Sequence, residues 1–250
     1  MHAEMAEVPD LGFRRPWAAA VDRAIGAVVE PVAAFLVLVE VAILAAGVFT
    51  RYVLRQPLSW TDELATILLL WLAMLGAVVA YRRSEHIRLS VVLRKCSPAR
   101  RALLETISSV ITAIFVLELM PASIAYFGQE QIDLSPALSI PQSYVVLAVI
   151  VGLALILVLA LLRLTEGDPK VVAAVIATAI AISAAAYFGR AAFAPLGNLN
   201  LVLFFVLLVG SCIAIGTPIA FSFGVGTLSY LFITTSVPAS TVVLRMDEGI

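Results

Sequence analysis

Two glutamates lie inside long apolar stretches of this chain, where an ionised side chain is costly. Glu40 falls within residues 27–49, and Glu118 falls within residues 103–127. Such carboxylates can form a proton or cation site, or they can be protonated or hydrogen-bonded side chains that link helices. We favour the second interpretation, because neither glutamate has an acidic or basic partner at helical spacing beside it. Glu30 lies nearer a helix end and is given no special role.

A second set of polar and aromatic residues begins in the loop after the first apolar stretch, residues 27–49. It continues after the next apolar stretch, residues 63–81. Its members are Arg51, Tyr52, Pro57, Trp60 and Glu63, followed by Arg82, Arg83, His86 and Arg88. Arginine, tyrosine and tryptophan are typical anchors at a membrane surface. Ser59 or Thr61 can cap the helix that begins here, and Asp62 and Glu63 complement its dipole. The pattern predicts anchoring and capping.

Motifs for several other kinds of chemistry are missing from the sequence. There is no Gly-x-x-x-x-Gly-Lys-Ser/Thr phosphate loop and no serine or cysteine nucleophile motif. With His2 and His86 as its histidines, the chain has too few for a His-rich metal or haem site. Cys96 and Cys212 indicate neither a disulfide framework nor a metal site. We expect no enzymatic activity, catalytic residue, metal ligand or cofactor.

Membrane helices must position these residues. Of the 250 residues, 62% are hydrophobic and 13% are charged, with a mean hydropathy of +1.06, whereas soluble domains carry about 25% charged residues. A spanning helix needs about 20 apolar residues. The fold class is therefore predicted as all-α, a polytopic integral membrane helix bundle. The candidate segments are residues 27–49, 63–81, 103–127, 143–162, 171–188, 199–216 and 218–234.

Two local patterns refine this division. Gly216-Thr217-Pro218 should break the helix between the last two segments, because proline lacks an amide donor and clashes with the preceding turn. We interpret residues 199–234 as a hairpin of two short spans rather than one broken span. In the fifth segment, an alanine stripe permits close approach of another helix. The stripe consists of Ala173, Ala177, Ala181 and Ala185.

Basic residues predict the orientation, because cytoplasmic loops are enriched in lysine and arginine. The loop between the second and third segments carries Arg82, Arg83, Arg88, Arg94, Lys95, Arg100 and Arg101, whereas residues 128–142 carry none. A cytoplasmic N-terminus places most basic residues inside. Residues 82–101 also mix basic and apolar side chains, which fits either an interfacial amphipathic helix or a plain loop.

These motifs resemble the small membrane subunit, called DctQ-like, of the tripartite ATP-independent periplasmic (TRAP) transporters. The resemblance covers residues 24–165 and rests on Arg51-Tyr52, on Pro57 to Leu64, on Arg82-Arg83 and on Glu85 to Arg88. Residues 198–250, especially Gly216, Pro218 and Phe221, resemble the beginning of the large, DctM-like subunit. Residues 1–23 are then a cytoplasmic tail, and residues 166–197 connect the two parts through one membrane helix.

The resemblance implies a secondary transporter in the bacterial inner membrane. It would be a sodium symporter that imports organic anions such as carboxylates and receives them from a periplasmic solute-binding protein. The implied partners are that protein, the large subunit and the bilayer, and no nucleic acid. Sodium, the coupling ion, would be bound in the absent part of the large subunit. The small subunit is expected to act as a scaffold and a docking element.

Two expectations remain open from the sequence. The chain is expected to be a fused small and large subunit that is cut within the large one, and the DNA after codon 250 would decide this. The alternative functions are a membrane anchor or assembly protein without a role in transport, and a self-contained proton-coupled carrier that uses Glu40 and Glu118. Neither alternative explains the motifs between residues 51 and 88.

Overall fold

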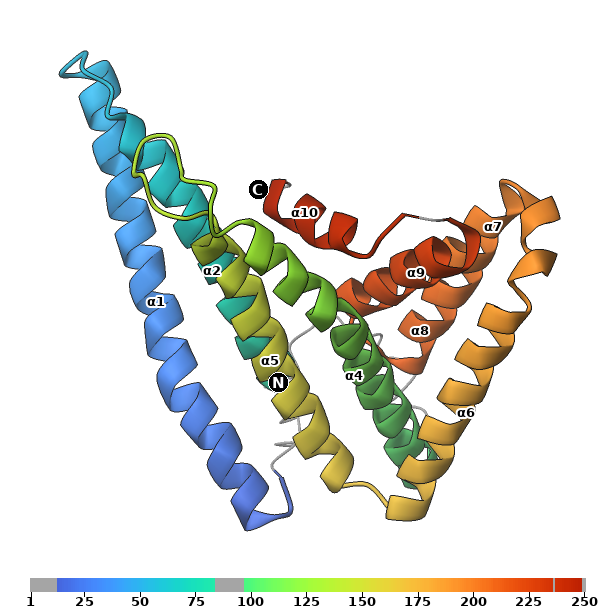
Figure 1. Cartoon of the computed structure of the whole chain (residues 1–250). Coiled ribbons are helices and arrows are strands. Elements are labelled where there is room, and N and C mark those ends of the chain that lie inside the picture. Colours follow the sequence, from blue (N-terminus) through green and yellow to red (C-terminus); the bar gives the residue numbers. More distant parts are fainter. Residues whose placement is uncertain (1–12, 84–96, 236, 249–250) are drawn as a thin grey trace, which may run out of the picture.

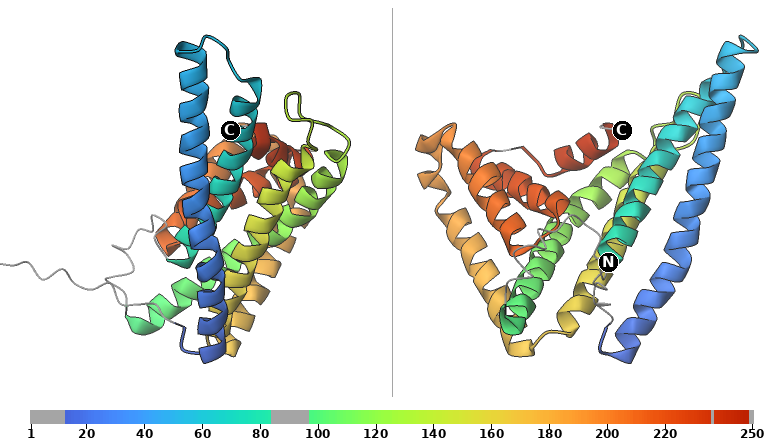
Figure 2. Two further views of the ribbon diagram at one scale, coloured as in Figure 1. Left: turned by 90° about the vertical axis from the view of Figure 1, so that its left-hand side faces the viewer. Right: turned by 180° about the vertical axis from the view of Figure 1, so that it is seen from behind.

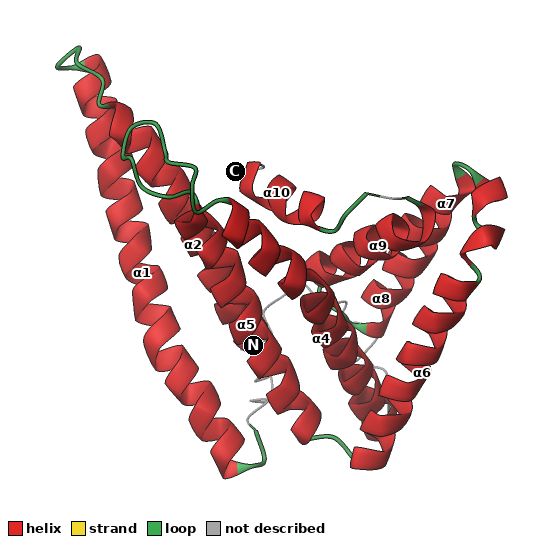
Figure 3. Cartoon of the chain, viewed as in Figure 1, coloured by secondary structure: helices red, strands yellow, loops and turns green. Residues whose placement is uncertain are grey.

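The computed structural model describes residues 13–83, 97–235 and 237–248, and these form helices joined by short turns and loops (Figure 3). No β-strand occurs within these ranges, apart from an isolated bridge between Leu134 and Pro141. Among the described residues, five helices are long and apolar enough to cross a membrane. The predicted all-α polytopic helix bundle is confirmed.

Four long helices make the first part of the bundle (Figure 1). They are α1 (Pro16–Tyr52), α2 (Ser59–Arg82), α4 (Pro98–Gln129) and α5 (Ser143–Thr165). In lipid, a helix satisfies its own backbone hydrogen bonds, so each apolar run folds in this way. α5 packs between α2 and α4, and α1 packs along α2. The most buried face of the bundle is accordingly on α5.

α1 is longer than the sequence analysis predicted. It begins at Pro16 and has 37 residues, which corresponds to about 55 Å at 1.5 Å per residue. The hydrocarbon layer is about 30 Å thick, so the charged first turns of α1 extend past it. The carboxylate of Glu166 accepts hydrogen bonds from the backbone amides of Arg14 and Arg15, at 3.0 and 3.1 Å. The end of α5 therefore caps the start of α1.

Close packing of α5 on α2 depends on one glycine. A Cβ atom at Gly152 would lie 2.5 Å from Cε and 2.9 Å from Cβ of Met74. Both distances are well below van der Waals contact, so a larger residue would push the two helices apart. By contrast, a Cβ atom at Gly76 of α2 would meet nothing within 4 Å.

The second part of the chain turns back toward α4. α6 (Pro169–Phe188) leads to two short 3₁₀ turns and then to α7 (Leu199–Leu201), a π-helical stretch η3 (Val202–Leu208) and α8 (Val209–Ile215). α9 (Ile219–Thr234) and α10 (Ser240–Glu248) follow. Figures 1 and 2 show α8 and α9 lying between α4 and α6. α9 contacts both of these helices.

The predicted break between the last two apolar segments is confirmed. Gly216 takes the left-handed conformation (φ 99°) at the end of α8, and Pro218 is the N-cap of α9. The left-handed region suits glycine, which has no Cβ. Residues 199–216 are less regular than predicted, because they hold α7, η3 and α8 and bend by 119° from the preceding 3₁₀ turns.

Candidate functional site

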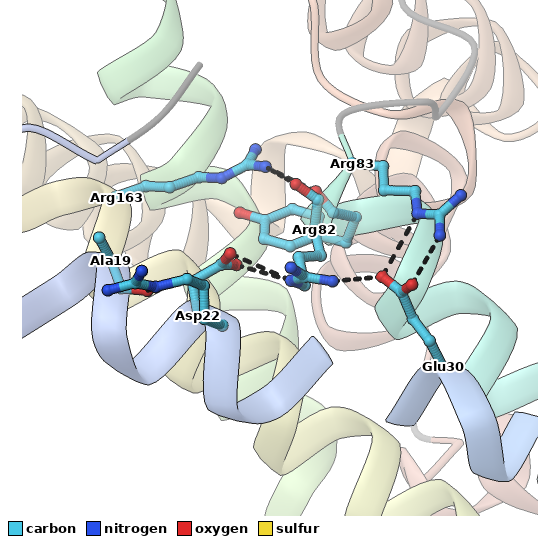
Figure 4. A network of polar contacts seen from close by, with 8 residues as sticks. Ala19, Asp22, Glu30, Arg82, Arg83 and Arg163 are labelled. Atoms are coloured by element: carbon cyan, nitrogen blue, oxygen red, sulfur yellow. Dashed lines mark hydrogen bonds and ion pairs between the residues drawn. The ribbon is translucent and has the colours of Figure 1, made fainter. Parts of the chain in front are cut away.

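Four charged side chains from α1 and α2 form one ion-pair network, the Arg82 cluster, which consists of Asp22, Glu30, Arg82 and Arg83 (Figure 4). Nε of Arg82 donates to both carboxylate oxygens of Asp22 at 3.1 Å, and its Nη1 donates to Glu30. Nη2 of Arg83 donates to the second oxygen of Glu30 at 2.7 Å. The side chains of Arg82 and Asp22 are only 19% and 17% exposed. The network therefore fixes the N-terminal half of α1 against the C-terminal end of α2.

Gly26 makes room for this network. It is buried on α1, and a Cβ atom there would lie 2.0 Å from Nη1 of Arg82. The guanidinium group thus crosses the surface of α1 where that helix has no side chain. This crossing allows one arginine to reach both Asp22 and Glu30, which lie two turns apart on α1.

Arg163 of α5 joins the same region from the other side. Its Nη2 donates to the backbone carbonyls of Tyr81 at 2.6 Å and of Arg82 at 3.3 Å. Carbonyls in the last turn of a helix lack intrahelical partners, and a cation there complements the helix dipole. The guanidinium also lies 4.4 Å from the ring centroid of Tyr81. Arg163 therefore holds the end of α2 and the Tyr81 ring together.

The Tyr81 ring extends these contacts to the second part of the chain. It meets the ring of Phe221 edge to face, with centroids 5.6 Å apart, and Phe115 of α4 lies 5.8 Å from the same phenylalanine. Tyr81 is 1% exposed and Phe221 is 5% exposed. The predicted large-subunit-like residues Gly216, Pro218 and Phe221 thus shape the start of α9 and its packing on the first part of the chain.

At the opposite end of the bundle, two acidic residues near the start of α2 have different partners. Arg51 donates to Asp62 at 2.6 Å, and both side chains are largely exposed. The carboxylate of Glu63 instead accepts from the backbone amides of Ala137 at 2.7 Å and Leu138 at 3.4 Å. Glu63 therefore ties the start of α2 to the loop between α4 and α5.

The capping prediction for Ser59 or Thr61 is wrong. The N-cap of α2 is Leu58, no side chain caps it, and the Thr61 hydroxyl donates to the Leu58 carbonyl. Thr61 is buried against Gly47, since a Cβ atom at that glycine would lie 3.0 Å from its hydroxyl oxygen. Packing of α1 on α2 thus takes the place of the local cap.

The other residues of the predicted anchoring group differ in their surroundings. Tyr52 is 75% exposed and Trp60 is 38% exposed, and Pro57 is also exposed. Such positions are compatible with interfacial anchoring. His86 and Arg88, together with the predicted amphipathic stretch of the 82–101 loop, lie outside the described residues.

The two intramembrane carboxylates lie apart. Glu40 is buried in α1, and its Oε2 atom has no hydrogen-bond partner among the described residues. Gly26 approaches Arg82 and Gly47 approaches Thr61, so the antiparallel register places Glu40 opposite Leu68 of α2, an apolar neighbour. Glu118 is exposed on α4 and faces α6. The structure therefore does not bring the two glutamates into one site.

Loosening of the α4–α5 loop is expected when Glu63 is replaced. In Glu63→Ala, the amides of Ala137 and Leu138 lose a charged acceptor, which should lower the local opening free energy by about 2 kcal/mol. Amide hydrogen exchange at these residues should become roughly 30-fold faster. Asp62→Ala is the matched control, because its carboxylate pairs with Arg51. Equal exchange in both variants would reject the role of Glu63.

The contacts of the Arg82 cluster, Arg163 and Glu63 all hold helices and loops to one another. Within the described residues, no three His, Cys, Asp or Glu side chains come together as metal ligands. The profile of the family "Tripartite ATP-independent periplasmic transporters, DctQ component" matches residues 40–170, which is more than half of the chain.

The chain belongs to the DctQ family.

It is thus a TRAP transporter component, a multi-pass membrane protein and not an enzyme.

Curated relatives agree with this assignment. A TRAP transporter small permease protein of Haemophilus influenzae is 27% identical over 118 residues, which are 47% of this chain and 73% of the relative. The sialic acid TRAP transporter small permease protein SiaQ of Vibrio cholerae is 33% identical over 49 residues, 20% of this chain and 28% of SiaQ. The sialic acid TRAP transporter permease protein SiaT of Haemophilus influenzae is 44% identical over 45 residues, 18% of this chain and 7% of SiaT.

Asp22, Glu30 and Arg163 contribute to these helix contacts but were not predicted from the sequence. Glu30 was given no special role from the sequence, yet it bonds to both Arg82 and Arg83. The separation of 52 residues between Glu30 and Arg82 hides this pairing in the sequence. The available signal was charge balance, because two acidic residues in the first half of α1 match an arginine pair at the end of α2.

Proposed function

We propose that this chain is the small-permease part of a sodium-driven, binding-protein-dependent transporter that imports organic anions, typically carboxylates, across the bacterial inner membrane. The observation that carries this proposal is the DctQ family match over residues 40–170. The names of SiaQ and SiaT make sialic acid one candidate among such anions.

In this proposal, the chain is a static scaffold. The Arg82 cluster ties α1 to α2, and Arg163 ties the end of α5 to the end of α2. Interior packing on both faces of α5 supports the same role, because close-packed interiors resist deformation. A rigid unit of this kind can brace a moving transport domain.

The surface around Arg51 is proposed as the docking element for a periplasmic solute-binding protein. It combines the Arg51–Asp62 ion pair with exposed side chains of Tyr52 and Ile132, which are 75% and 85% exposed. Exposed aromatic and arginine side chains are enriched at protein interfaces. Glu63 adds to the surface by holding the loop that carries Ile132.

Residues 198–250 are proposed as the beginning of a large, DctM-like permease fused to the small one. Support comes from the motif residues Gly216, Pro218 and Phe221 and from the packing of Phe221 against Tyr81 and Phe115, which joins the two parts. Sodium and the solute would then bind in the remainder of the large permease.

A cytoplasmic N-terminus is part of the proposal, and cysteine labelling tests it. In a background without Cys96 and Cys212, Ile132→Cys should react with a membrane-impermeant maleimide in spheroplasts. Lys170→Cys lies in the first turn of α6, at the other end of the bundle, and should react only after permeabilisation. This pattern follows from the excess of arginine at the Arg82 end. The reverse labelling pattern would overturn the orientation.

Reconstituted transport tests the function. Proteoliposomes with this chain, its large permease and the binding protein should accumulate at least one anion from a panel of sialic acid, a C4-dicarboxylate, a 2-oxo acid and a sugar acid. Uptake should require an inward sodium gradient and the binding protein. Tyr52→Ser combined with Ile132→Ser should raise the binding-protein concentration needed for half-maximal uptake, without changing the maximal rate. Uptake that persists without the chain would refute the proposal.

A further inference from the structure

A groove between α4 and α6 has no described role in the packing of the first part of the chain. Its volume is about 440 Å³, and its lining includes Ile114 and Glu118 of α4 and Ile180, Ser183 and Tyr187 of α6. The lining is mostly apolar but contains a carboxyl group and two hydroxyl groups. No residue of α6 is buried, although α6 is apolar enough to span a membrane. The helix therefore presents most of its surface outward.

Glu118 lies at a membrane depth where exposure of a carboxyl group is costly. It is 11 residues before the end of α4, or about 17 Å along the helix axis, which places it inside a hydrocarbon layer about 30 Å thick. Its side chain is exposed, and no described residue donates a hydrogen bond to the carboxyl group. Carboxyl groups at such depth normally face a partner or a cavity. A hydrogen-bond donor is therefore needed opposite Glu118.

The alanine stripe of α6 continues this groove along the helix. Ala173, Ala177, Ala181 and Ala185 are all exposed. At about 100° per residue, Ala177 and Ala181 lie next to the groove residues Ile180 and Ala184 on the helix surface. Small side chains let a second helix approach closely. The groove and the stripe together form a continuous face that carries the small residues typical of close helix packing.

We propose that this α4–α6 face binds one transmembrane helix of the large permease, and that this helix places a hydrogen-bond donor side chain on Glu118. The inference rests on the proposed transport function. Two observations select this occupant over lipid tails: the carboxyl group requires a polar partner, and the face is continuous with α9, which already packs on both α4 and α6. Lipid tails offer no donor.

Photo-crosslinking in the complete transporter tests the site. Benzoylphenylalanine is introduced in place of Ile180, native membranes are irradiated, and the products are mapped by peptide mass spectrometry. The expected product joins α6 to a helix of the large permease other than α8 and α9. Glu118→Leu should lower its yield at least fivefold, whereas Leu117→Ala, at a neighbouring exposed position, should leave it unchanged.

A second variant keeps the test independent of Glu118. Ala181→Phe fills the exposed stripe and should lower the cross-link yield as strongly, whereas Ile182→Phe points away from the groove and should not. Cross-links to lipid alone, or to a second copy of this chain, would overturn the docking site even if sodium-dependent uptake is intact. Absence of that uptake in the complete transporter would instead reject the transport proposal.

Discussion

Arg82→Met is expected to lower the free energy of unfolding by about 3 kcal/mol, because it leaves two shielded carboxylates without their shared cation. Arg82 bonds to both Asp22 and Glu30, and methionine keeps most of the side-chain volume. The measurement is equilibrium denaturation of the purified chain in detergent micelles, followed by tryptophan fluorescence. Since Arg83 still pairs with Glu30, Asp22 should contribute most of the loss.

The exposed ion pair at the opposite end of the bundle supplies the control. Arg51→Met removes the partner of Asp62, but both side chains are largely in contact with solvent, and such pairs contribute at most about 1 kcal/mol. Adding Asp22→Asn to Arg82→Met should recover most of the lost stability, because position 22 then carries no charge and Glu30 keeps Arg83 as its partner. Equal losses for Arg82→Met and Arg51→Met would contradict the importance of the Arg82 cluster.

Gly152→Leu is expected to destabilise the bundle by about 3 kcal/mol, since extra volume at a close-packed contact forces a shift of side chains and backbone. Even the first added carbon would lie 2.9 Å from Cβ of Met74, an atom that can move only with α2 itself. Gly152→Ala should show a smaller loss of about 1 to 2 kcal/mol. The measurement is the same denaturation experiment.

Gly76 is the matched control for this helix contact. It also lies in a membrane helix, and a Cβ atom there meets nothing within 4 Å. Gly76→Ala and Gly76→Leu should therefore be neutral or slightly stabilising, because they reduce the conformational freedom of the unfolded chain. A loss at Gly76 as large as that at Gly152 would show that any added side chain is harmful, which would contradict a specific role of the contact between Gly152 and Met74.

Apolar length predicted the helices well, because a bilayer leaves the backbone few other ways to satisfy its hydrogen bonds. The break at Gly216 and Pro218 was predictable for a similarly local reason, the backbone limits of these two residue types. Helix ends were predicted less well. α1 begins at Pro16 rather than near residue 27, since its charged first turns are stabilised by Glu166 and Arg82, which are distant in sequence.

The contacts of single side chains depended on tertiary structure. Thr61 looked like a helix cap but is buried against Gly47 instead. Glu30 looked unimportant, because its partners come from another helix. The family motifs between residues 51 and 88 identified the class of protein from the sequence. They could not reveal that the Arg82 side chain crosses α1 at Gly26, because this crossing depends on how α1 and α2 are aligned in the folded protein.

The bond from Glu166 to the start of α1 has a consequence for biosynthesis. The two ends of this contact are 152 residues apart in the chain. At ribosomal speeds of about 5 to 20 residues per second, Glu166 is synthesised roughly 8 to 30 s after the start of α1. The hydrogen bonds between the two can form only after that interval. In that interval the pair formed by α1 and α2 must persist in the lipid on its own contacts, above all those of Arg82. Pairing of α1 with α2 during synthesis therefore relies on Arg82, and the later Glu166 completes the packing of α1.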